Sequence, residues 1–241
     1  MSAEAAASRV VLITGAAGGL GQGLSGEFAA QGWRVAAAVH HSARLGEGEQ
    51  VWQLQLDVTI RSHAEAAARQ ILARWGRIDV LINNAGITAD ALTWQIGEDD
   101  WEKVLDVNLK GAFLCSQAVI GQMIKQRDGH IINIASLSGR TGARGQANYA
   151  AAKAGLFGLT QSLAREVGSR NVRVNAVLPG VLPTPMTARL GEPQLAEFAA
   201  ANVLGRLNTV AEAARFVVFL AGMQNVSGQL FQLDSRICRW S

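Results

Sequence analysis

This 241-residue sequence has no long hydrophobic stretch and no run of like charge. No apolar run reaches the roughly 20 residues that a membrane-spanning helix needs, and residues 1–9 lack the basic stretch and apolar core of a secretory signal. The 22 basic and 19 acidic residues give a net charge of +3, which argues against a nucleic-acid or membrane-surface protein. The sequence therefore predicts a cytoplasmic protein.

Cysteine and histidine are also scarce, and neither occurs in a functional spacing. Cys115 and Cys238 form no Cys-x-x-Cys motif, so we interpret both as structural thiols rather than as a disulfide. The histidines show no metal-ligand spacing, and we expect no metal ion. The four histidines are His40, His41, His63 and His130.

What the sequence has in quantity is hydrophobic residues, at 49%, and glycine, at 26 residues. That much apolar material is enough for one large core, and many single α/β domains have this length. Short apolar segments alternate with helical patterns, which predicts parallel strands joined by helices, in one domain over residues 1–241. The expected strands are 10–14, 34–39, 51–56, 78–82, 129–134, 171–177 and 229–233.

A glycine-rich turn directly follows the first expected strand. Residues 15–21 read Gly-Ala-Ala-Gly-Gly-Leu-Gly and lead into a helix that runs through Phe28. Glycines let the backbone turn sharply and come close to a pyrophosphate at the positive end of a helix. A glycine-rich loop alone is often a flexible turn, but its place between strand and helix predicts a dinucleotide site.

The second expected strand ends in a bend without the carboxylate that would hold the 2′-hydroxyl of NAD. His40, His41, Ser42 and Arg44 occupy that bend instead. A neutral-to-basic bend accommodates a 2′-phosphate, and we therefore predict NADP as the cofactor. The alternative is that these are solvated loop residues, and Gly18 offers no charge from the glycine turn.

Polar or small residues also end the next two expected strands. Asp57-Val58 follows the third, and Asp57 either accepts a hydrogen bond from an adenine amino group or caps the helix expected from about residue 62 to residue 75. Asn83-Asn84-Ala85-Gly86 follows the fourth. Small residues there let a flat ligand lie against the backbone, and the amides can tie neighbouring strands together.

Asn108 lies within a helical pattern from about residue 99 to residue 125, where a polar amide is poorly favoured. It binds water or a ligand, or it bonds to the preceding helical turn. Ser136 ends the fifth expected strand and should face the same crevice as the glycine turn, with Ser138 as the rival hydroxyl. Trp94 either shapes the substrate pocket or only packs against the rest of the protein.

Tyr149 and Lys153 are one turn apart on the same face of a helix that is expected to end near Gly168. At an effective dielectric of about 20, an ammonium roughly 4 Å from the phenol contributes about 4 kcal/mol, or about three pKa units. Such a shift would bring the phenol into the range of a general acid or base. The alternative is an ordinary surface pair. Residues 181–207 are irregular and are typical of a movable lid over a substrate.

Together these motifs resemble the short-chain dehydrogenase/reductases over nearly the whole chain. The matching segments, in the family's order, are Thr14-Gly15-x-x-x-Gly19-x-Gly21, Asn83 to Gly86, Asn108, Ser136 with twelve residues between it and Tyr149, Tyr149-x-x-x-Lys153 and Pro179-Gly180. The resemblance favours Ser136 over Ser138. It implies a doubly wound Rossmann fold, with a seven-stranded parallel sheet and helices on both faces, and hydride transfer between a nicotinamide and a carbonyl carbon.

The resemblance also implies residue roles. Tyr149 would donate a proton to the developing alkoxide, and Lys153 would lower the pKa of Tyr149 and bind the nicotinamide ribose. Ser136 would hold the carbonyl oxygen, and Asn108 would hold a water linked to Lys153. The implied cofactor contacts are Gly15, Gly19, Leu20, Gly21, His40, Asp57, Val58, Asn84, Ala85, Gly86, Tyr149, Lys153, Pro179, Gly180, Val181 and Thr184. Members are usually homotetramers, with the Asn108 and Tyr149 helices at one dimer interface.

Within this family, the chain is most similar to the 3-oxoacyl-[acyl-carrier-protein] reductases of fatty acid synthesis. The run from Gly145 to Gly155 carries the likeness. Arg127 and Arg170 fall where those enzymes place arginines that dock the acidic carrier protein, although arginine is also common at helix ends. The chain departs from them after the last strand, where they usually have a Gly-Gly segment and this sequence reads Leu233-Asp-Ser-Arg236.

Three hypotheses follow. The first is an NADPH-dependent reductase of 3-oxoacyl thioesters, with the substrate on acyl carrier protein or as a small molecule. The second is a dehydrogenase of another small ketone or secondary alcohol, such as acetoacetyl-coenzyme A, a sugar or a steroid. The third is a dinucleotide-binding sensor without turnover, which the intact catalytic set disfavours.

Overall fold

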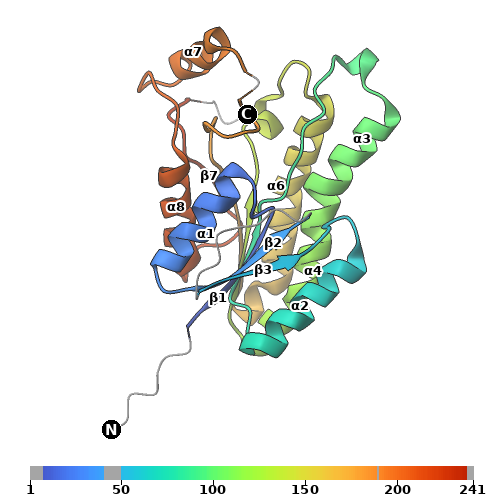
Figure 1. Cartoon of the computed structure of the whole chain (residues 1–241), viewed down its shortest axis with the longest axis vertical. Helices are drawn as coiled ribbons and strands as arrows, with labels where there is room; N and C mark the ends of the chain where they lie inside the picture. Colours follow the sequence, from blue (N-terminus) through green and yellow to red (C-terminus); the bar gives the residue numbers. More distant parts are fainter. Residues whose placement is uncertain (1–7, 41–49, 189, 238–241) are drawn as a thin grey trace.

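Seven parallel strands form one sheet in the described part of the chain, residues 8–40, 50–188 and 190–237 of the computed structural model (Figure 1). Apolar and β-branched residues fill these strands, as expected for a sheet that is buried on both faces. The strands are β1 (Val10–Thr14), β2 (Arg34–Val39), β3 (Val51–Gln55), β4 (Val80–Asn83), β5 (Gly129–Ile134), β6 (Val172–Leu178) and β7 (Leu230–Gln232).

The strand order is β3-β2-β1-β4-β5-β6-β7. The chain moves outward from β1 to β3 and then returns to add β4 on the other side of β1. The order therefore reverses between β1 and β4. In open α/β sheets, ligands bind at the carboxyl ends of the strands at such a point, which is where the glycine turn lies.

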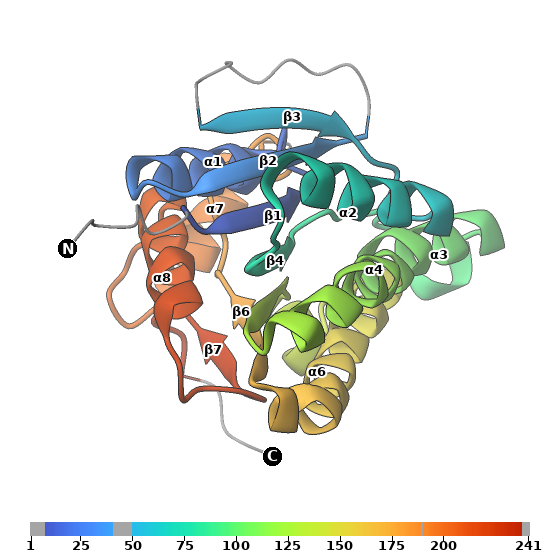
Figure 2. The ribbon, with the colours of Figure 1, turned by 90° about the horizontal axis from the view of Figure 1, so that it is seen from below.

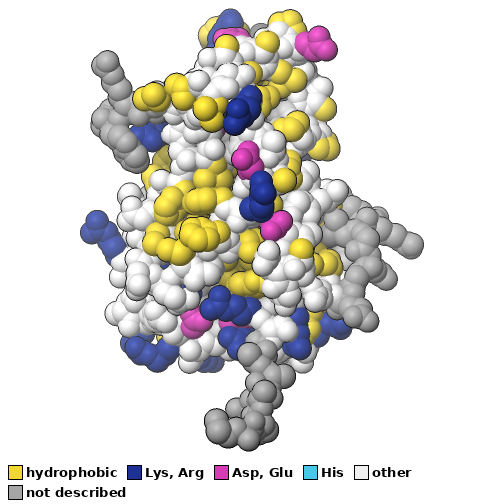
Figure 3. All heavy atoms as spheres, turned by 90° about the vertical axis from the view of Figure 1, so that its left-hand side faces the viewer, with side chains coloured by type: hydrophobic (Ala, Val, Ile, Leu, Met, Phe, Trp, Pro, Cys, Tyr) yellow, Lys and Arg dark blue, Asp and Glu magenta, His cyan; other side chains and the backbone are white. Residues whose placement is uncertain are grey.

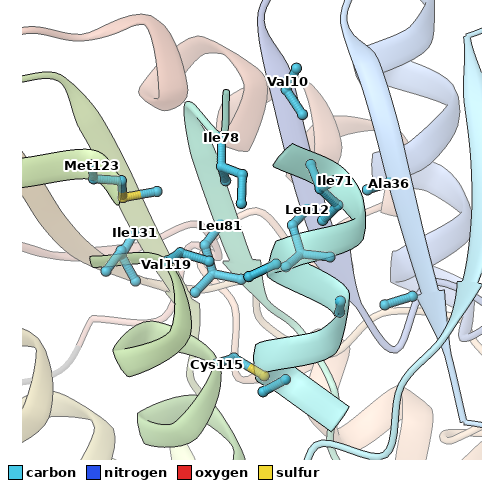
Figure 4. Close-up of a cluster of buried hydrophobic side chains, with 14 of the residues drawn as sticks. Val10, Leu12, Ala36, Ile71, Ile78, Leu81, Cys115, Val119, Met123 and Ile131 are labelled. Atoms are coloured by element: carbon cyan, nitrogen blue, oxygen red, sulfur yellow. The ribbon is translucent and has the colours of Figure 1, made fainter. Parts of the chain in front are cut away.

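Strand β1 shows why both faces of the sheet need cover. Val10 and Leu12 pack in one apolar cluster, whereas Val11 and Ile13 pack in another on the opposite face. All four are at most 2% exposed, because alternate side chains of a strand point to opposite faces. Figure 4 shows the first cluster, to which β1, β4, β5, α2 and α4 contribute.

Helices α1 and α8 cover one face of the sheet, and α2, α4 and α6 cover the other (Figure 2). The helices are α1 (Gly19–Ala30), α2 (Arg61–Trp75), α3 (Glu98–Leu105), α4 (Gly111–Gln126), α5 (Ser138–Thr141), α6 (Ala147–Val167), α7 (Glu192–Ala200) and α8 (Val210–Gly222). Three further short turns are η1 (Thr93–Gln95), η2 (Asp106–Lys110) and η3 (Gly168–Arg170).

The predicted fold is confirmed, and each strand bound agrees with the expected one to within two residues. Three local features differ. The helix expected from residue 99 to residue 125 contains a π-helical turn at η2. The glycine-containing loop after β5 includes the short helix α5. The irregular lid contains α7, which starts with Pro193 in its first turn and buries no side chain, so its helical period is weak.

The structure also bears on the expected absences. No described helix could cross a membrane. Within the same residues, no group of three or more His, Cys, Asp or Glu side chains could hold a metal ion. Cys115 is 1% exposed, and burial raises the pKa of its thiol to about 12, which confirms a structural role. Cys238 lies outside the described residues.

Candidate active site

The ends of β1 and β4 are joined by hydrogen bonds at the point where the strand order reverses. The backbone N–H groups of Asn84 and Ala85 both donate to Thr14 Oγ1 at 3.0 Å. The Asn84 side chain in turn donates to the carbonyl oxygens of Thr14, at 3.0 Å, and Gly15, at 3.1 Å. These bonds fix the glycine turn against the segment after β4.

Backbone atoms crowd the glycine turn so closely that side chains do not fit. Gly15 has a φ of +63°, and a Cβ there would lie 2.8 Å from the Cα of Ala85. A Cβ on Gly21 would lie 2.3 Å from the carbonyl oxygen of Gly15. The first turn of α1 holds no acidic residue, and no side chain caps it. The positive end of α1 therefore offers free backbone N–H groups to an anionic group.

The lid begins directly over this turn. A Cβ on Gly19 would lie 2.8 Å from the side chain of Thr184. The side chain of Thr187 holds this segment by accepting from Thr184 N at 3.0 Å and donating to the carbonyl oxygen of Leu182 at 2.6 Å. Thr184 and Gly19, 165 positions apart in the sequence, thus face the same space.

Asp57 lies just beyond the carboxyl end of β3. Its side chain does not cap α2, so the prediction of a helix cap is wrong. Helix α2 begins at Arg61 without a side-chain cap. Asp57 Oδ1 instead accepts from the backbone N, at 2.9 Å, and the hydroxyl, at 2.7 Å, of Thr59. Its Oδ2 lies 3.2 Å from His40 Nε2. Burial raises the pKa of Asp57, but these hydrogen bonds and the histidine together hold it below its usual value.

Part of the predicted phosphate bend cannot be placed. His41, Ser42 and Arg44 lie outside the described residues, whereas His40 is exposed at the end of β2. The side chains of Leu20 and Val58, two of the expected cofactor contacts, belong to the two core clusters.

Asn108 lies in the π-helical turn η2 and is 1% exposed. Its Nδ2 donates to the carbonyl oxygens of Val104 at 2.8 Å and Ile87 at 2.9 Å, so it does bond to the preceding turn. Its Oδ1 is buried and has no hydrogen-bond partner in the described residues. A Cβ on Gly86 would lie 2.7 Å from that oxygen and 3.6 Å from Lys153 Nζ. The two polar atoms thus flank one small space, which suits a bridging water.

Lys153 and Ser136 both lie close to Tyr149. Lys153 is 4% exposed; its Nζ lies 5.5 Å from the centroid of the Tyr149 ring and donates to the carbonyl oxygen of Ile134 at 2.8 Å. Ser136 Oγ accepts from Ser138 N at 3.2 Å, and the Ser136 side chain also forms a hydrogen bond with Tyr149. The structure thus brings Asn108, Ser136, Tyr149 and Lys153 together.

Burial, rather than Lys153, dominates the acidity of the phenol. It raises the pKa of Tyr149 to about 12, against the opposing effect of Ser136, and the charge of Asp90 adds to the rise. Burial also lowers the pKa of Lys153 to about 8. The expected lowering of the Tyr149 pKa by about three units is therefore wrong for this structure. At neutral pH the phenol keeps its proton.

The expected tie between strands is confirmed. Asn83 at the end of β4 donates from Nδ2 to Asn133 Oδ1 of β5 at 2.8 Å, and Asn133 Nδ2 donates to the hydroxyl of Thr160 in α6 at 2.8 Å. This buried chain of amides holds α6 against the sheet, because each buried polar group needs a partner.

Beyond β6, Gly180 adopts a φ of +81°, and a Cβ there would lie 2.8 Å from Asp234 Cβ. The carbonyl oxygen of Pro179 accepts from Asn208 Nδ2 at 2.9 Å. Val181 follows as a half-buried residue at the start of the lid. The Pro179–Gly180 turn is therefore held by Asn208, just after the lid, and by Asp234 in the tail.

Two expected residues lie far from this site. Arg127 ends α4 in the left-handed conformation, and Arg170 ends η3. Asn171 joins the two segments by donating to the carbonyl oxygen of Arg127 at 2.8 Å. Both arginines are at the amino edge of the sheet, before β5 and β6. Tyr149 is at the opposite end of α6.

Sequence reasoning missed a polar link beside Tyr149. Ser138 Oγ donates to Gln146 Oε1 at 3.1 Å, and Gln146 Nε2 lies 3.3 Å from Asp90 Oδ1. A backbone hydrogen bond from Ala91 N to the carbonyl oxygen of Gly145, at 3.0 Å, strengthens the same link. Asp90 follows the Asn83 to Gly86 segment, but nothing in its spacing marks a contact 56 residues away. Trp94, in the same loop, is 80% exposed.

Comparison with known proteins gives a consistent result. A profile described as short chain dehydrogenase matches residues 9–195. The chain is similar to the 3-oxoacyl-[acyl-carrier-protein] reductase FabG of Thermotoga maritima, with 42% identity over 236 residues, 94% of this chain and 96% of that protein. It is also similar to the protein of that name from Escherichia coli, with 41% identity over 218 residues, 88% and 89% of the two chains. A 3-oxoacyl-[acyl-carrier-protein] reductase of Synechocystis is 38% identical over 236 residues, 94% and 96% of the two chains.

Proposed function

The chain belongs to the short-chain dehydrogenase family, and on this premise we propose that it reduces 3-oxoacyl groups on acyl carrier protein to 3-hydroxyacyl groups, with NADPH as reductant. The similar proteins named for this reaction support the substrate class. The observation that supports the chemistry best is the grouping of Asn108, Ser136 and Lys153 around the half-buried phenol of Tyr149, which keeps its proton at neutral pH.

Family membership implies a nicotinamide dinucleotide, and the crevice fits one. The bare backbone of the glycine turn at the positive end of α1 suits a pyrophosphate. Asp57 and Val58 would lie at the adenine, Asn84 to Gly86 and Lys153 at the ribose, and Pro179 to Thr184 at the nicotinamide. The bound dinucleotide supplies the hydride. The absence of a carboxylate at His40 favours NADP over NAD.

Tyr149 acts as the proton donor in this proposal. Its raised pKa keeps the phenol protonated at neutral pH, which is the form that reduction of a carbonyl requires. Ser136 directs its hydroxyl at the same oxygen and stabilises the negative charge that grows there. Lys153 contributes a positive charge beneath the ring. A water held between Asn108 Oδ1 and Lys153 Nζ would return the proton to Tyr149.

We also propose a homotetramer in the cytoplasm. The outer faces of α4 and α6 would form one interface, and Phe113 on α4 is 40% exposed. Figure 3 shows hydrophobic side chains gathered on the side of the molecule that carries α8, where Phe219 is 64% exposed. Exposed apolar patches of this kind mark protein interfaces.

A second candidate is another short-chain dehydrogenase/reductase reaction on a small ketone or secondary alcohol. The observation that favours it is the tail, where Asp234 packs against Gly180 and the chain reads Leu233-Asp-Ser-Arg236 in the region of the usual Gly-Gly segment. A non-catalytic dinucleotide sensor is the remote third candidate, and nothing in the site favours it.

The test measures NADPH oxidation with acetoacetyl-carrier protein and acetoacetyl-coenzyme A side by side, with NADH as the control cofactor. We expect the carrier-protein substrate to be preferred, and NADPH to be preferred over NADH by about tenfold in kcat/KM, or about 1.4 kcal/mol. Preference for coenzyme A, or turnover of other ketones only, would favour the second candidate. Tight NADPH binding without turnover of any carbonyl compound would favour the sensor.

A further inference from the structure

Ser235 and Arg236 lie in the tail that follows β7, and the proposed function gives these side chains no role. The structure shows what the two side chains do here, and their partners belong to the lid and to the Pro179–Gly180 turn.

Ser235 binds the end of lid helix α7 through four hydrogen bonds. Its backbone N, at 2.9 Å, and its Oγ, at 3.2 Å, both donate to Asn202 Oδ1. Its carbonyl oxygen accepts from Val203 N at 3.3 Å, and its Oγ accepts from Leu204 N at 3.2 Å. The hydroxyl takes part in two of the four bonds.

Asn202 is well placed to transmit this contact to the helix. It is 5% exposed, and its Nδ2 donates to the carbonyl oxygen of Phe198, in the last turn of α7, at 2.8 Å. The same side chain therefore ends the helix and binds the tail. Val203 and Leu204, which follow it, are 68% and 60% exposed.

Arg236 holds the tail on the other side. Its Nε donates to Asp234 Oδ2 at 2.6 Å, and the Asp234 side chain is 2% exposed. Asp234 lies directly against Gly180. Adjacent residues of the tail thus contact the turn that borders the proposed nicotinamide position and the end of the lid.

Among the described residues, the start of the lid is anchored by Leu182, which is buried in a core cluster and is bonded to Thr187. Just after the lid, Asn208 donates to the carbonyl oxygen of Pro179. Helix α7 between them buries no side chain. Elements with few buried contacts open at low free-energy cost, so the orientation of α7 depends strongly on its bonds to the tail.

We propose that Ser235 is a positioning residue for substrate binding: its bonds to Asn202 and Leu204 fix the carboxyl end of the lid helix over the catalytic crevice. This proposal rests on the proposed function in one respect, that residues 181–207 cover the substrate. The tail then provides a fixed attachment for the lid, and substrate affinity depends on it.

The test compares Ser235→Ala and Ser235→Gly with the intact protein in two measurements. We expect amide hydrogen exchange in peptides covering 192–204 to be about tenfold faster and KM for the 3-oxoacyl substrate to rise about fivefold, with kcat within about twofold, because two hydrogen bonds are lost. Ser235→Thr, which keeps the hydroxyl, should restore both values. Ser169→Ala, an exposed serine in η3 at the other end of α6, should change neither.

Asn202→Ala extends the test. Asn202→Ala and Ser235→Ala remove the same contact. The double variant should therefore raise the exchange rate and KM only slightly more than the stronger of the two single variants does. Unchanged exchange at 192–204 in Ser235→Ala would overturn the attachment. Faster exchange with unchanged KM would overturn its role in substrate binding. If the intact protein turns over no 3-oxoacyl thioester, the proposed function fails, while the exchange measurement still decides the attachment.

Discussion

At the scale of single residues, burial governs the chemistry of this molecule more than charged neighbours do. Tyr149 and Lys153 are one helical turn apart, yet burial raises the pKa of the first to about 12 and lowers that of the second to about 8. Each group is held toward its neutral form. A neutral phenol suits the proposed role of Tyr149 as a proton donor.

His130, at the start of β5, is a second residue controlled by burial. It is 0% exposed, and burial together with the charge of Arg173 lowers its pKa to about 3. Its Nε2 lies 2.8 Å from Asn175 Nδ2, which fits a neutral ring. In the unfolded chain the ring titrates near pH 6.5. The stability that this residue gives is therefore complete above about pH 6.5 and is lost as the pH falls toward 3.

We predict that His130→Gln, which can still accept from Asn175, weakens this acid sensitivity. The free energy of unfolding of the intact protein should fall by up to about 1.4 kcal/mol more per pH unit than that of the variant between about pH 6 and pH 4. Urea unfolding at several pH values measures the difference. His63→Gln, on the exposed face of α2, is the control. Parallel profiles for the intact protein and His130→Gln would show that His130 does not carry the effect.

At the scale of elements, the turn from β1 into α1 has two kinds of glycine. Gly21 is packed against backbone, since a Cβ there would lie 2.3 Å from the Gly15 carbonyl oxygen. Gly26, five residues later in the same helix, has nothing within 4 Å of such a Cβ. Glycine is required at position 21 because the backbone of Gly15 comes so close, whereas Gly26 only weakens the helix.

We predict opposite effects of one substitution at these positions. Gly21→Ala should destabilise the fold by roughly 1–3 kcal/mol through overpacking and should weaken NADPH binding. Gly26→Ala should stabilise it by roughly 0.5–1 kcal/mol and leave NADPH binding unchanged. Thermal unfolding and fluorescence titration with NADPH measure both. Equal effects of Gly21→Ala and Gly26→Ala on stability and NADPH binding would show that close backbone contact does not constrain Gly21.

Much at this scale could be predicted from sequence because the signals are local. The β-branched runs define the strands, and the glycines define the turn. Helix α7 was not predicted because it buries nothing, and the π turn at Asn108 was not predicted because it depends on a contact with Ile87, 21 residues away. The bonds of Asn202 with Ser235 span 33 residues. Such contacts have no periodic pattern to reveal them.

At the scale of the whole molecule, the sheet separates the two proposed sites in space. The proposed catalytic residues lie at the carboxyl edge, and Arg127 and Arg170 lie at the amino edge. The 21 residues of α6 span about 30 Å between the two edges. The proposed docking arginines are therefore separated from the proposed active site of the same subunit by about the length of α6.

We predict that reversing both charges, with Arg127→Glu and Arg170→Glu, raises KM for acetoacetyl-carrier protein by about tenfold and leaves KM for acetoacetyl-coenzyme A within about twofold. Steady-state rates on the two substrates measure this. Sedimentation of the variant checks that its assembly is intact. A uniform change on both substrates would reject docking at these residues.

The central claim, that Tyr149 gives its proton to the substrate, is tested most directly by Tyr149→Phe, which removes only the phenol oxygen of the single tyrosine in the chain. The account predicts that NADPH oxidation with acetoacetyl-carrier protein falls by roughly a thousandfold or more, in line with the loss of a general acid, while the affinity for NADPH stays within about threefold. Reduction at more than about a tenth of the original rate would contradict it.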